Sequence, residues 1–474
     1  MVTSYDRVAY PTALFPRTHP GRMAVAARLA GLEPAPLERA RVLEIAGGDC
    51  LNLIAFAAAY PHSDCHGFDL AETAIARGQS LIAGAGLGNA HLVVDDILEA
   101  HRRYPARSFD YVIAHGIYAW VPPGVREAIM SLIDHVLAER GVAIISYNAM
   151  PGGHVRLIMR DMLLEAIGDE TEPDARMERA RAFLQRYTEL PTGDDALRAG
   201  LRTYAATMLD RNPAVLFHDE LGEEFHPQSL TDVIRAAERS GMRYLSDVAH
   251  RRFFDGFLDD DAEGQASTSV EADEQVRHVA QLEDYAVTRF FRYSTFVRRE
   301  QPIDRRIDPM RIADLWATWD MTRNPDGSFQ ADKDVIEIQV PEIAERITAL
   351  TPELPQRIPV RRIAQTIEEL RALLVIFGQG YLRLHPDPGP MIALPGERPQ
   401  TSPLARAMLA RGDRLVCRLD HKFLSIEQPD LRALLLAADG TRTLAELQAG
   451  EHGIAADQVA AALAAACGKA LLCA

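Results

Sequence analysis

The chain has few residues of the kinds that would build a metal centre, a disulfide framework or a membrane span. Its 474 residues include five cysteines, whose positions show no metal-ligand spacing and whose odd number argues against a disulfide framework. No apolar run reaches about 18 residues, and the segment from Met1 to Phe15 lacks the apolar core of a signal peptide. These absences predict a cytoplasmic protein with no metal and no stable membrane insertion.

Positive charge is also scarce. The 67 acidic residues outnumber the 51 basic ones, which gives a formal net charge of -16. Proteins bind phosphate backbones through clusters of Lys and Arg, so this balance argues against nucleic acid as a partner. Among the basic residues only Lys333, Lys422 and Lys469 are lysines. With 47% hydrophobic residues the chain can bury sizeable cores, and its length suggests about three domains.

One short segment carries the first functional signal. An apolar strand pattern over 41–45 runs into the loop Glu44-x-Ala46-x-Gly48-x-Cys50, and a helix pattern follows. Doubly wound α/β domains place a nucleotide pocket at the carboxyl end of their first strand in this way. The G-x-G-x-x-G fingerprint of a dinucleotide site is absent. The loop therefore predicts a pocket for an adenosine-type cofactor, with an ordinary strand, turn and helix as the alternative.

Further strand patterns follow, separated by helical patterns. The second strand pattern ends at Phe68-Asp69-Leu70, and an acid about 20 residues after the loop can accept both ribose hydroxyls of a nucleoside. Other strand patterns lie at 91–97, 109–115 and 141–148, and helical patterns lie at 51–60, 71–83 and 123–138. Strands that alternate with helices indicate a parallel sheet with crossovers. The predicted fold class is α/β, with a doubly wound, Rossmann-like sheet.

Several motifs resemble a known family. The loop has the E-x-G-x-G-x-G spacing of class I S-adenosylmethionine (SAM) methyltransferases, with Ala46 and Cys50 in place of two glycines. The other motifs are Tyr5-Asp6, Tyr10-Pro11, Thr18-His19-Pro20, Ala114 to Pro122, Ser146 to His154, Leu216 to Leu221 and Arg289 to Thr295. Together they resemble bacterial SAM-dependent methyltransferases with a methyltransferase regulatory domain. That family includes rickettsial-type protein lysine methyltransferases that act on outer-membrane proteins.

The resemblance implies a map of the cofactor site. Glu44 and Gly48 are expected against the methionine end of SAM, and Asp69 against the ribose. Asp95 and Asp96 compete for the place near the adenine amine. The remaining expected cofactor contacts are Ala46, Gly47, Leu70, Ile97 and His115. Alanine at position 46 would be strained if the loop needs a positive φ there, and tolerated if it does not.

Methyl transfer from a sulfonium is an in-line displacement, so the acceptor must be aligned and water excluded. Class I enzymes place acceptor-binding groups just after the fourth strand, which here means His115 to Trp120. Tyr118 can bind an ammonium group by hydrogen bond and cation–π contact, with Trp120 as a second aromatic wall. Both can equally be packing residues. His115 is a candidate proton acceptor or a hydrogen-bonded structural residue.

Other candidates follow the fifth strand. Asn148 is a candidate catalytic residue, and His154 a candidate for substrate binding, because both bracket the loop at the predicted cofactor edge. His218 and Glu220 match a pattern of the family and are candidates for binding the substrate amine, or form a cluster that caps its own helix. The Asn/Asp-Pro-Pro-Tyr motif of DNA adenine and glutamine amide methylases is absent.

The predicted domains are a SAM-binding methyltransferase domain at 1–160, a helical insertion plus regulatory domain at 161–299, and winged-helix-like α+β modules at 300–394 and 395–474. The regulatory part, 205–299, is expected to complete the sheet with strands at 242–248 and 290–297. Helices are predicted at 156–167, 174–187, 229–240, 341–350, 359–373, 429–438, 443–449 and 456–467, strands at 374–384 and 470–473, and loops at 250–285 and 386–390.

The expected function is SAM-dependent N-methylation of lysine side chains in a protein or peptide. The resemblance to the rickettsial enzymes carries the lysine part and suggests a homodimer. Two alternatives stay open. One is methylation of a small metabolite or natural-product scaffold, and the other is a non-catalytic binding protein whose altered loop no longer holds SAM.

Overall fold

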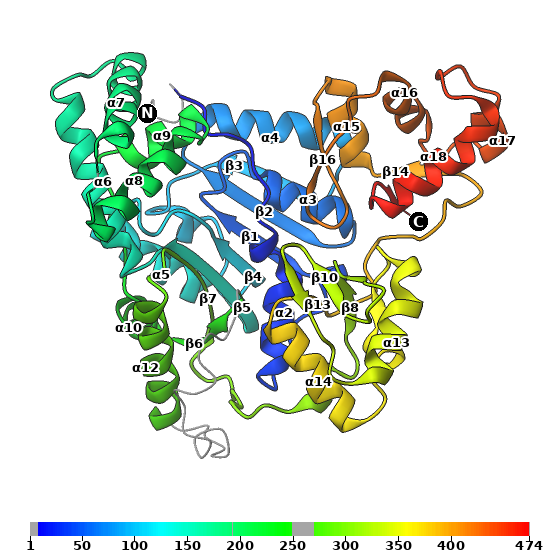
Figure 1. The fold of residues 1–474 in the computed structure, drawn as a ribbon, viewed down its shortest axis with the longest axis horizontal. Helices are drawn as coiled ribbons and strands as arrows, with labels where there is room; N and C mark the ends of the chain where they lie inside the picture. The colour runs from blue at the N-terminus through cyan, green and yellow to red at the C-terminus, as the bar shows by residue number, and fades with distance from the viewer. Residues whose placement is uncertain (1–7, 192, 249–269, 474) are drawn as a thin grey trace.

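The structure, a computed structural model, describes residues 8–191, 193–248 and 270–473. A seven-stranded sheet forms its centre, helices cover both faces, and the C-terminal part adds helices and small antiparallel sheets (Figure 1). The strand order of the central sheet is β3-β2-β1-β4-β5-β7-β6. The doubly wound α/β fold predicted from the sequence is confirmed.

The first five strands run parallel. They are β1 (Arg41–Ile45), β2 (Asp64–Asp69), β3 (Ala90–Val94), β4 (Phe109–Ala114) and β5 (Leu137–Asn148). One face of the sheet is covered by α2 (Pro20–Leu29), α3 (Leu51–Ala59) and α4 (Glu72–Ala85), and the other by α5 (Pro123–Val136) and α10 (Leu230–Arg239). Because both faces are covered, every residue of β1 after Arg41 is buried. Apart from Glu44, these buried residues are all apolar.

The sheet is completed late in the chain, as predicted. Strand β7 (Phe291–Arg298) pairs antiparallel with β5 and with β6 (Met242–Asp247). The loop predicted at 250–285 is wrong over 270–285, because α12 occupies Val270–Ala286. The rest of that prediction, 250–269, lies outside the described residues. Arg243 and Arg305 form ion pairs with Asp273 and hold this helix on the protein.

Between β5 and β6 the chain forms the predicted helical insertion. Its helices are α6 (Gly152–Ile167), α7 (Pro173–Glu189), α8 (Ala196–Leu209) and α9 (Pro213–Leu221). They surround a core of their own, with Met159, Leu163, Leu184, Met208 and Leu216 all buried. The insertion is therefore a separate packing unit that begins directly after the end of β5.

The segment after Arg299 forms a middle module. It contains a sheet of β12 (Ile358–Pro359), β8 (Trp316–Trp319) and β13 (Leu382–His385), a second sheet of β9 (Thr322–Arg323), β10 (Phe329–Ala331) and β11 (Asp334–Ile336), and the helices α13 (Pro341–Leu350) and α14 (Ile367–Gly378). The predicted helix at 359–373 and strand at 374–384 are wrong in their bounds. A capping box between Thr366 and Glu369 starts α14 late, and the apolar run that follows stays helical.

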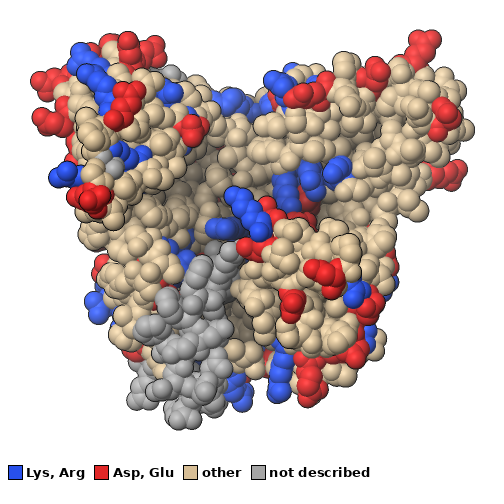
Figure 2. Space-filling view, in the orientation of Figure 1, with Lys and Arg blue, Asp and Glu red and all other residues tan. Residues whose placement is uncertain are grey.

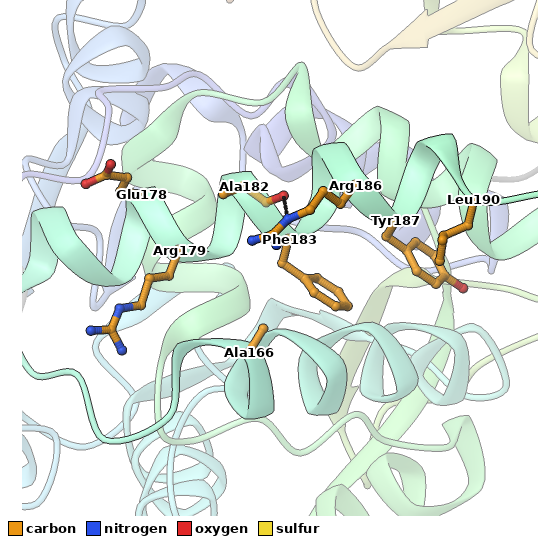
Figure 3. Close-up of a pocket in the computed structure, with 8 residues that line it drawn as sticks. All are labelled: Ala166, Glu178, Arg179, Ala182, Phe183, Arg186, Tyr187 and Leu190. Carbon is orange, nitrogen blue, oxygen red and sulfur yellow. Dashed lines mark hydrogen bonds between the residues drawn. The ribbon is translucent and has the colours of Figure 1, made fainter.

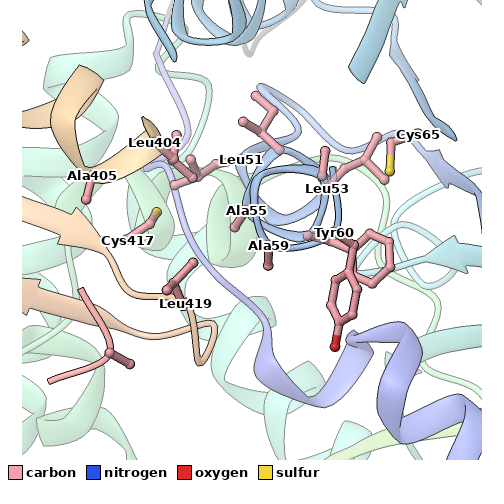
Figure 4. Packing of buried hydrophobic residues seen from close by; sticks show 14 of the residues in the cluster. Leu51, Leu53, Ala55, Ala59, Tyr60, Cys65, Leu404, Ala405, Cys417 and Leu419 are labelled. Carbon is pink, nitrogen blue, oxygen red and sulfur yellow. The ribbon is translucent and has the colours of Figure 1, made fainter. Parts of the chain in front are cut away.

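The C-terminal module packs against the helix that follows the cofactor loop. Its elements are β14 (Gln400–Thr401), α15 (Pro403–Arg411), β15 (Leu415–Cys417), β16 (Phe423–Ser425), α16 (Pro429–Ala437), α17 (Leu444–Gln448), α18 (Ala456–Gly468) and β17 (Leu472–Cys473). Figure 4 shows its apolar side chains beside those of α3; the labelled residues include Leu404, Ala405, Cys417 and Leu419 opposite Leu51 and Ala55. The likeness of this module and the middle module to winged helices stays a prediction.

Within the described ranges, no helix combines the length and the apolar composition that a membrane span requires.

Candidate functional site

The loop after β1 has left-handed backbone at three alternate positions. Ala46 has φ 53°, Gly48 has φ 61° and Cys50 has φ 52°. This conformation costs a non-glycine residue about 1–2 kcal/mol, so Ala46 is strained, as the sequence argument required for a positive φ. The two replacements of glycine thus leave the bend of the loop in place, and its cost is carried by the surrounding fold.

Glu44 lies buried beneath this loop. Its Oε1 accepts a hydrogen bond from the side-chain amide of Asn52 at 2.9 Å, and its Oε2 accepts one from the backbone N–H of Leu53 at 3.2 Å. Burial raises the pKa of Glu44 to about 7. These bonds hold the first turn of α3 against β1, and the expected contact with the methionine end of SAM stays a prediction.

Asp69, at the end of β2, reaches the same loop. One carboxylate oxygen accepts a hydrogen bond from the backbone N–H of Gly48 at 2.8 Å, and the other accepts one from the N–H of Ala71 at 2.8 Å. The next residue, Leu70, is an exposed apolar side chain at this edge of the sheet. Asp69 therefore lies where an acid could bind a ribose and also stabilises the loop that would hold the cofactor.

The two acids after β3 differ in their contacts. Asp95 forms an ion pair with Arg103 at 2.6 Å. Asp96 accepts a hydrogen bond from the backbone N–H of Leu98 at 3.0 Å and has no cationic partner within the described part of the chain. Asp96 is therefore the acid that the geometry favours for the adenine amine. The adjacent Ile97 is partly buried and packs on the core behind the sheet.

His115 directly follows β4 and lies inside a group of aromatic rings. Its Nδ1 lies 2.6 Å from the Oγ of Ser146, and its ring centroid lies 3.8 Å from that of Phe15 and 5.8 Å from that of Tyr293. Burial lowers the pKa of His115 to about 3. The imidazole is therefore neutral at pH 7 and a poor proton acceptor, which favours the structural alternative that the sequence left open.

We refer to Phe15, His115, Phe291 and Tyr293 as the aromatic group. The ring of Phe291 lies 6.0 Å from that of His115, and Phe15, Phe291 and Tyr293 are all partly exposed. Of these four residues the sequence had singled out only His115 as a candidate; Phe291 and Tyr293 lie in a motif of the family that carried no expected role, and Phe15 lies outside the motifs. They meet because β7 pairs antiparallel with β5, which places Tyr293 beside Ser146.

Tyr118 and Trp120 have packing partners on both sides. Tyr118 is 3% exposed, makes an edge contact with the ring of Tyr147, and has its pKa raised to about 12 by burial. Trp120 packs against Phe225 with the two rings tilted by 38°, and the guanidinium of Arg156 lies 4.9 Å from the Trp120 ring centroid. These contacts fit the packing alternative, and a part in catalysis stays a prediction.

The remaining candidates lie in two places. Asn148 ends β5 with its Oδ1 buried and without a hydrogen-bond partner in the described ranges, whereas His154 is exposed on α6. The ring of His218 hydrogen-bonds to the backbone carbonyl of Val8 at 2.7 Å. Glu220 is fully buried and is described below as part of an ion-pair cluster. Substrate binding by His154, His218 and Glu220 stays a prediction, and for Glu220 the burial leaves no accessible oxygen.

Asn52 joins three distant parts of the chain at the cofactor loop. Its side-chain amide donates to Glu44, and its Oδ1 accepts from the backbone N–H of Phe15 at 3.0 Å and from the Nε2 of His421 at 2.7 Å. His421 belongs to the turn between β15 and β16 in the C-terminal module. The C-terminal module thus reaches the buried carboxylate of the loop through a single side chain.

Replacing Asn52 with alanine is expected to lower the free energy of unfolding by about 3 kcal/mol, because Glu44 and His421 each lose a buried partner. Chemical unfolding followed by tryptophan fluorescence measures this change. Asn89→Ala, which removes a partly buried amide that bonds to backbone carbonyls at the C-terminal end of α3, is the matched control. An Asn52 variant no less stable than this control contradicts the assignment.

The lowered pKa values of four histidines lead to a second prediction, that the protein becomes less stable in acid. Burial lowers the pKa of His19, His115, His385 and His421, so each is neutral in the folded protein, while in the unfolded chain each takes up a proton below about pH 6.5. The unfolded state then binds more protons, and stability falls as the pH drops through that value. Glu44, with its raised pKa, acts in the opposite direction for one proton.

We therefore expect the free energy of unfolding to fall by about 4 kcal/mol between pH 6 and pH 5, because the unfolded chain binds about three more protons than the folded one. Urea titrations at pH 7, 6 and 5 measure it. His385→Gln should reduce the slope by about one proton. A stability that does not change between pH 6 and pH 5 contradicts the prediction.

Two pockets of the structure are lined by none of the candidate cofactor residues, although the second adjoins the cofactor loop. Figure 3 shows a pocket of about 670 Å³ on α6 and α7, lined by Phe183, Tyr187 and Leu190 among others, and no candidate cofactor residue lines it. A second pocket, of about 560 Å³, lies between the cofactor loop and α4 and includes Asp49 and Arg77.

Among the described residues, Asp64, His66 and His91 place ligand atoms within 4.8 Å of one another. They lie near the amino ends of β2 and β3, opposite the edge that carries Asp69. The sequence search for metal ligands considered cysteine spacing and did not predict this group, because His91 meets the other two residues only through the pairing of β2 with β3. Exposed groups of this kind are common without an ion, and we assign no metal to it.

The residues at the carboxyl edge of the sheet fit SAM. A Cβ built on Gly48 or Gly116 would meet no atom within 4 Å, so the ends of β1 and β4 face open space. Around this space lie the apolar surface of Leu70 and the unpaired carboxylate of Asp96, and β5 ends there with the orphaned Oδ1 of Asn148. Apolar surface suits the adenine ring, and hydrogen-bond acceptors suit its amine and the ribose hydroxyls.

Comparison with known proteins agrees with this geometry. Residues 42–141 match a methyltransferase domain, and residues 212–298 match a predicted methyltransferase regulatory domain. The chain is 32% identical over 221 residues to the uncharacterised protein RP028 of Rickettsia prowazekii, covering 46% of this chain and 88% of that protein. It is 27% identical over 311 residues to RP789 of the same organism, covering 64% of this chain but only 54% of that longer protein.

A solved structure has the same fold along nearly the whole chain. PKMT2 from Rickettsia typhi superposes with a TM-score of 0.81 at 23% identity, covering 98% of this chain and 100% of that one. The fold and the matched domain define a class I methyltransferase, whose cofactor is SAM. The chain belongs to the family of SAM-dependent methyltransferases that carry a methyltransferase regulatory domain.

Proposed function

We propose that this methyltransferase acts on the side-chain amine of lysine in a protein or peptide. The observation that carries the proposal is the aromatic group at the end of β4, whose rings of Phe15, Phe291 and Tyr293 are partly exposed beside the cofactor edge. Aromatic faces attract alkylammonium groups through cation–π contacts. The sequence motifs shared with rickettsial-type protein lysine methyltransferases support the same acceptor.

SAM, when bound, supplies an electrophilic methyl group, whose bond to sulfur breaks with its electron pair left on sulfur as the bond to the acceptor nitrogen forms. The acceptor amine must be uncharged to attack, so its environment has to lower its pKa. The guanidinium of Arg17 lies 5.4 Å from the ring centroid of Tyr293 and adds positive charge there, while His115 stays neutral. The amine proton is then lost to water before transfer.

The first test is a labelling experiment. The purified protein is incubated with SAM labelled in its methyl group and with cell fractions, and the labelled material is separated by size and analysed by mass spectrometry. Label on lysines of proteins or peptides supports the proposal. Label confined to small molecules favours a metabolite methyltransferase, and calorimetry without detectable heat for either SAM or S-adenosylhomocysteine favours a non-catalytic binding protein.

Replacing Tyr293 with leucine is expected to lower kcat/KM for a lysine substrate about tenfold with little change in the Kd for SAM, because a cation–π contact contributes about 1–2 kcal/mol. The buried Tyr244, on the neighbouring strand β6, supplies the control variant Tyr244→Phe, whose kcat/KM should stay near that of the parent. Unchanged kcat/KM in Tyr293→Leu argues against the aromatic group as the acceptor site.

The partner proposed here is thus a protein or peptide and not a nucleic acid. A homodimer and a cytoplasmic location stay predictions from the sequence.

A further inference from the structure

Positive charge gathers in one hollow of this acidic protein. Figure 2 shows Lys and Arg side chains together at the middle of this face, in the hollow between the insertion and the two C-terminal modules. Arg17, just before α2, and Arg383, on β13 of the middle module, both repel Arg22 in the first turn of α2. We call these three residues the arginine cluster.

The members of the arginine cluster differ in their partners. Arg383 forms an ion pair with Asp320, which Lys422 also approaches at 3.6 Å. The guanidinium of Arg22 makes no hydrogen bond or ion pair with any residue that the structure describes, although the side chain is only partly exposed. Burial, followed by repulsion from Arg383 and Arg17, lowers the pKa of Arg22 to about 10, so it stays charged at pH 7.

An unpaired, half-buried cation is unfavourable unless an anion binds to it. The neighbouring groups cannot supply that anion. Arg17 has no acidic partner in the described ranges, Asp320 is already shared by Arg383 and Lys422, and burial keeps His385 and His421 neutral. The local field around the arginine cluster is therefore positive within a chain of net charge -16, and a positive region of this kind attracts negative ligands.

The arginine cluster adjoins the proposed acceptor site. Arg17 lies over the ring of Tyr293, and Tyr293 stacks on His115 with an angle of 12° between the ring planes. When the lysine amine of a substrate reaches the aromatic group, the substrate residues next to that lysine would therefore lie beside Arg17 and Arg22. Guanidinium groups bind carboxylates through paired, charge-assisted hydrogen bonds.

We propose that Arg17 and Arg22 bind the carboxylate of an acidic residue next to the acceptor lysine, so that the substrates are acidic protein segments. The lysine part rests on the proposed function, whereas the carboxylate site does not. Neutralisation by the arginines also serves the chemistry. A free carboxylate beside the amine would raise the amine's pKa and keep it protonated, and pairing with arginine removes that effect.

The test uses the full chain and matched peptides that carry one lysine flanked by either glutamates or glutamines. We expect KM for the glutamate peptide to be about tenfold lower, which corresponds to one good charge pair. In Arg22→Gln this preference should fall below about twofold, and Arg22→Lys should restore part of it. Arg371→Gln, which removes an exposed charge on α14, is the control and should keep the full preference.

Binding is measured separately with peptides in which norleucine replaces lysine, so that catalysis is not needed. If neither lysine peptide is methylated but the glutamate norleucine peptide binds through Arg22, the carboxylate site stands and the lysine function fails. Equal binding of the two norleucine peptides overturns the carboxylate site. A rise of about tenfold in the Kd for SAM in Arg22→Gln also overturns the carboxylate site, because it would assign Arg22 to the cofactor. Tighter binding of a phosphoserine peptide overturns it as well, because the site would then belong to phosphorylated segments.

Discussion

Replacing Asp69 with alanine is expected to weaken SAM binding about 100-fold, the largest effect on function that we predict for a single residue. Two hydrogen bonds from backbone N–H groups end on this carboxylate, one of them from Gly48 in the cofactor loop. A hydrogen bond to a charged group contributes about 1.5–3 kcal/mol, so losing the loop contact and the expected ribose contact amounts to about 3 kcal/mol. Isothermal titration with SAM and with S-adenosylhomocysteine measures the change.

The control for this variant lies on the same strand. Asp64 begins β2 at the opposite edge of the sheet, is exposed and bonds to His66 rather than to the loop. Asp64→Ala should bind SAM as the parent does, and Asp69→Asn should fall between the two. If Asp69→Ala and Asp64→Ala bind SAM equally well, the assignment of the cofactor edge is wrong.

Replacing Glu220 with alanine is expected to lower the free energy of unfolding by about 3–5 kcal/mol, the largest effect on stability that we predict. The carboxylate of Glu220 is fully buried and accepts hydrogen bonds from Arg156 and from Arg211, both at 2.8 Å. Arg156 is itself buried, and its remaining carboxylate partner is Asp219. Removal of Glu220 leaves buried positive charge without its main partner.

Chemical unfolding of matched variants tests this role. Glu223 lies three residues further along the chain and is exposed, so Glu223→Ala should cost less than about 0.5 kcal/mol. The double variant Glu220→Leu with Arg156→Leu should recover part of the loss, because an apolar pair of similar volume avoids the unpaired charge. A Glu220 variant as stable as the Glu223 variant would show that the ion-pair cluster does not support the insertion.

Local sequence patterns predicted the parts of this protein in which neighbouring residues decide the structure. The alternation of apolar strands with helices predicted the sheet because burial on both faces requires apolar strands. The spacing from the loop to Asp69 placed that acid correctly, because consecutive parallel strands bring their carboxyl ends to one edge. The prediction of a loop at 250–285 failed over residues 270–285 for the opposite reason. The charge of Asp273 on α12 is balanced by arginines from β6 and from the chain after β7, which no local pattern could indicate.

The candidate site was predictable to a smaller extent. The cofactor side follows the sheet edge, so the sequence could place Asp69 and Asp96 at that edge from their positions after strands, while their contacts with SAM stay predictions. On the acceptor side, sequence reasoning chose Tyr118 and Trp120, whose rings pack within the fold. It passed over Phe15 and Tyr293, which come from opposite ends of the first 300 residues.

The sequence by itself determined the class of this protein, because a strand, a bent loop and an acid after the next strand are local features that suffice to build a SAM pocket. The tertiary structure decided what surrounds that pocket. Antiparallel pairing of β5 with β7 placed Tyr293 beside His115, and packing of the C-terminal module on α3 brought His421 to Asn52 across 369 positions of sequence. Contacts of this kind depend on which buried surfaces meet, and side-chain packing between distant segments leaves no periodic trace in the chain.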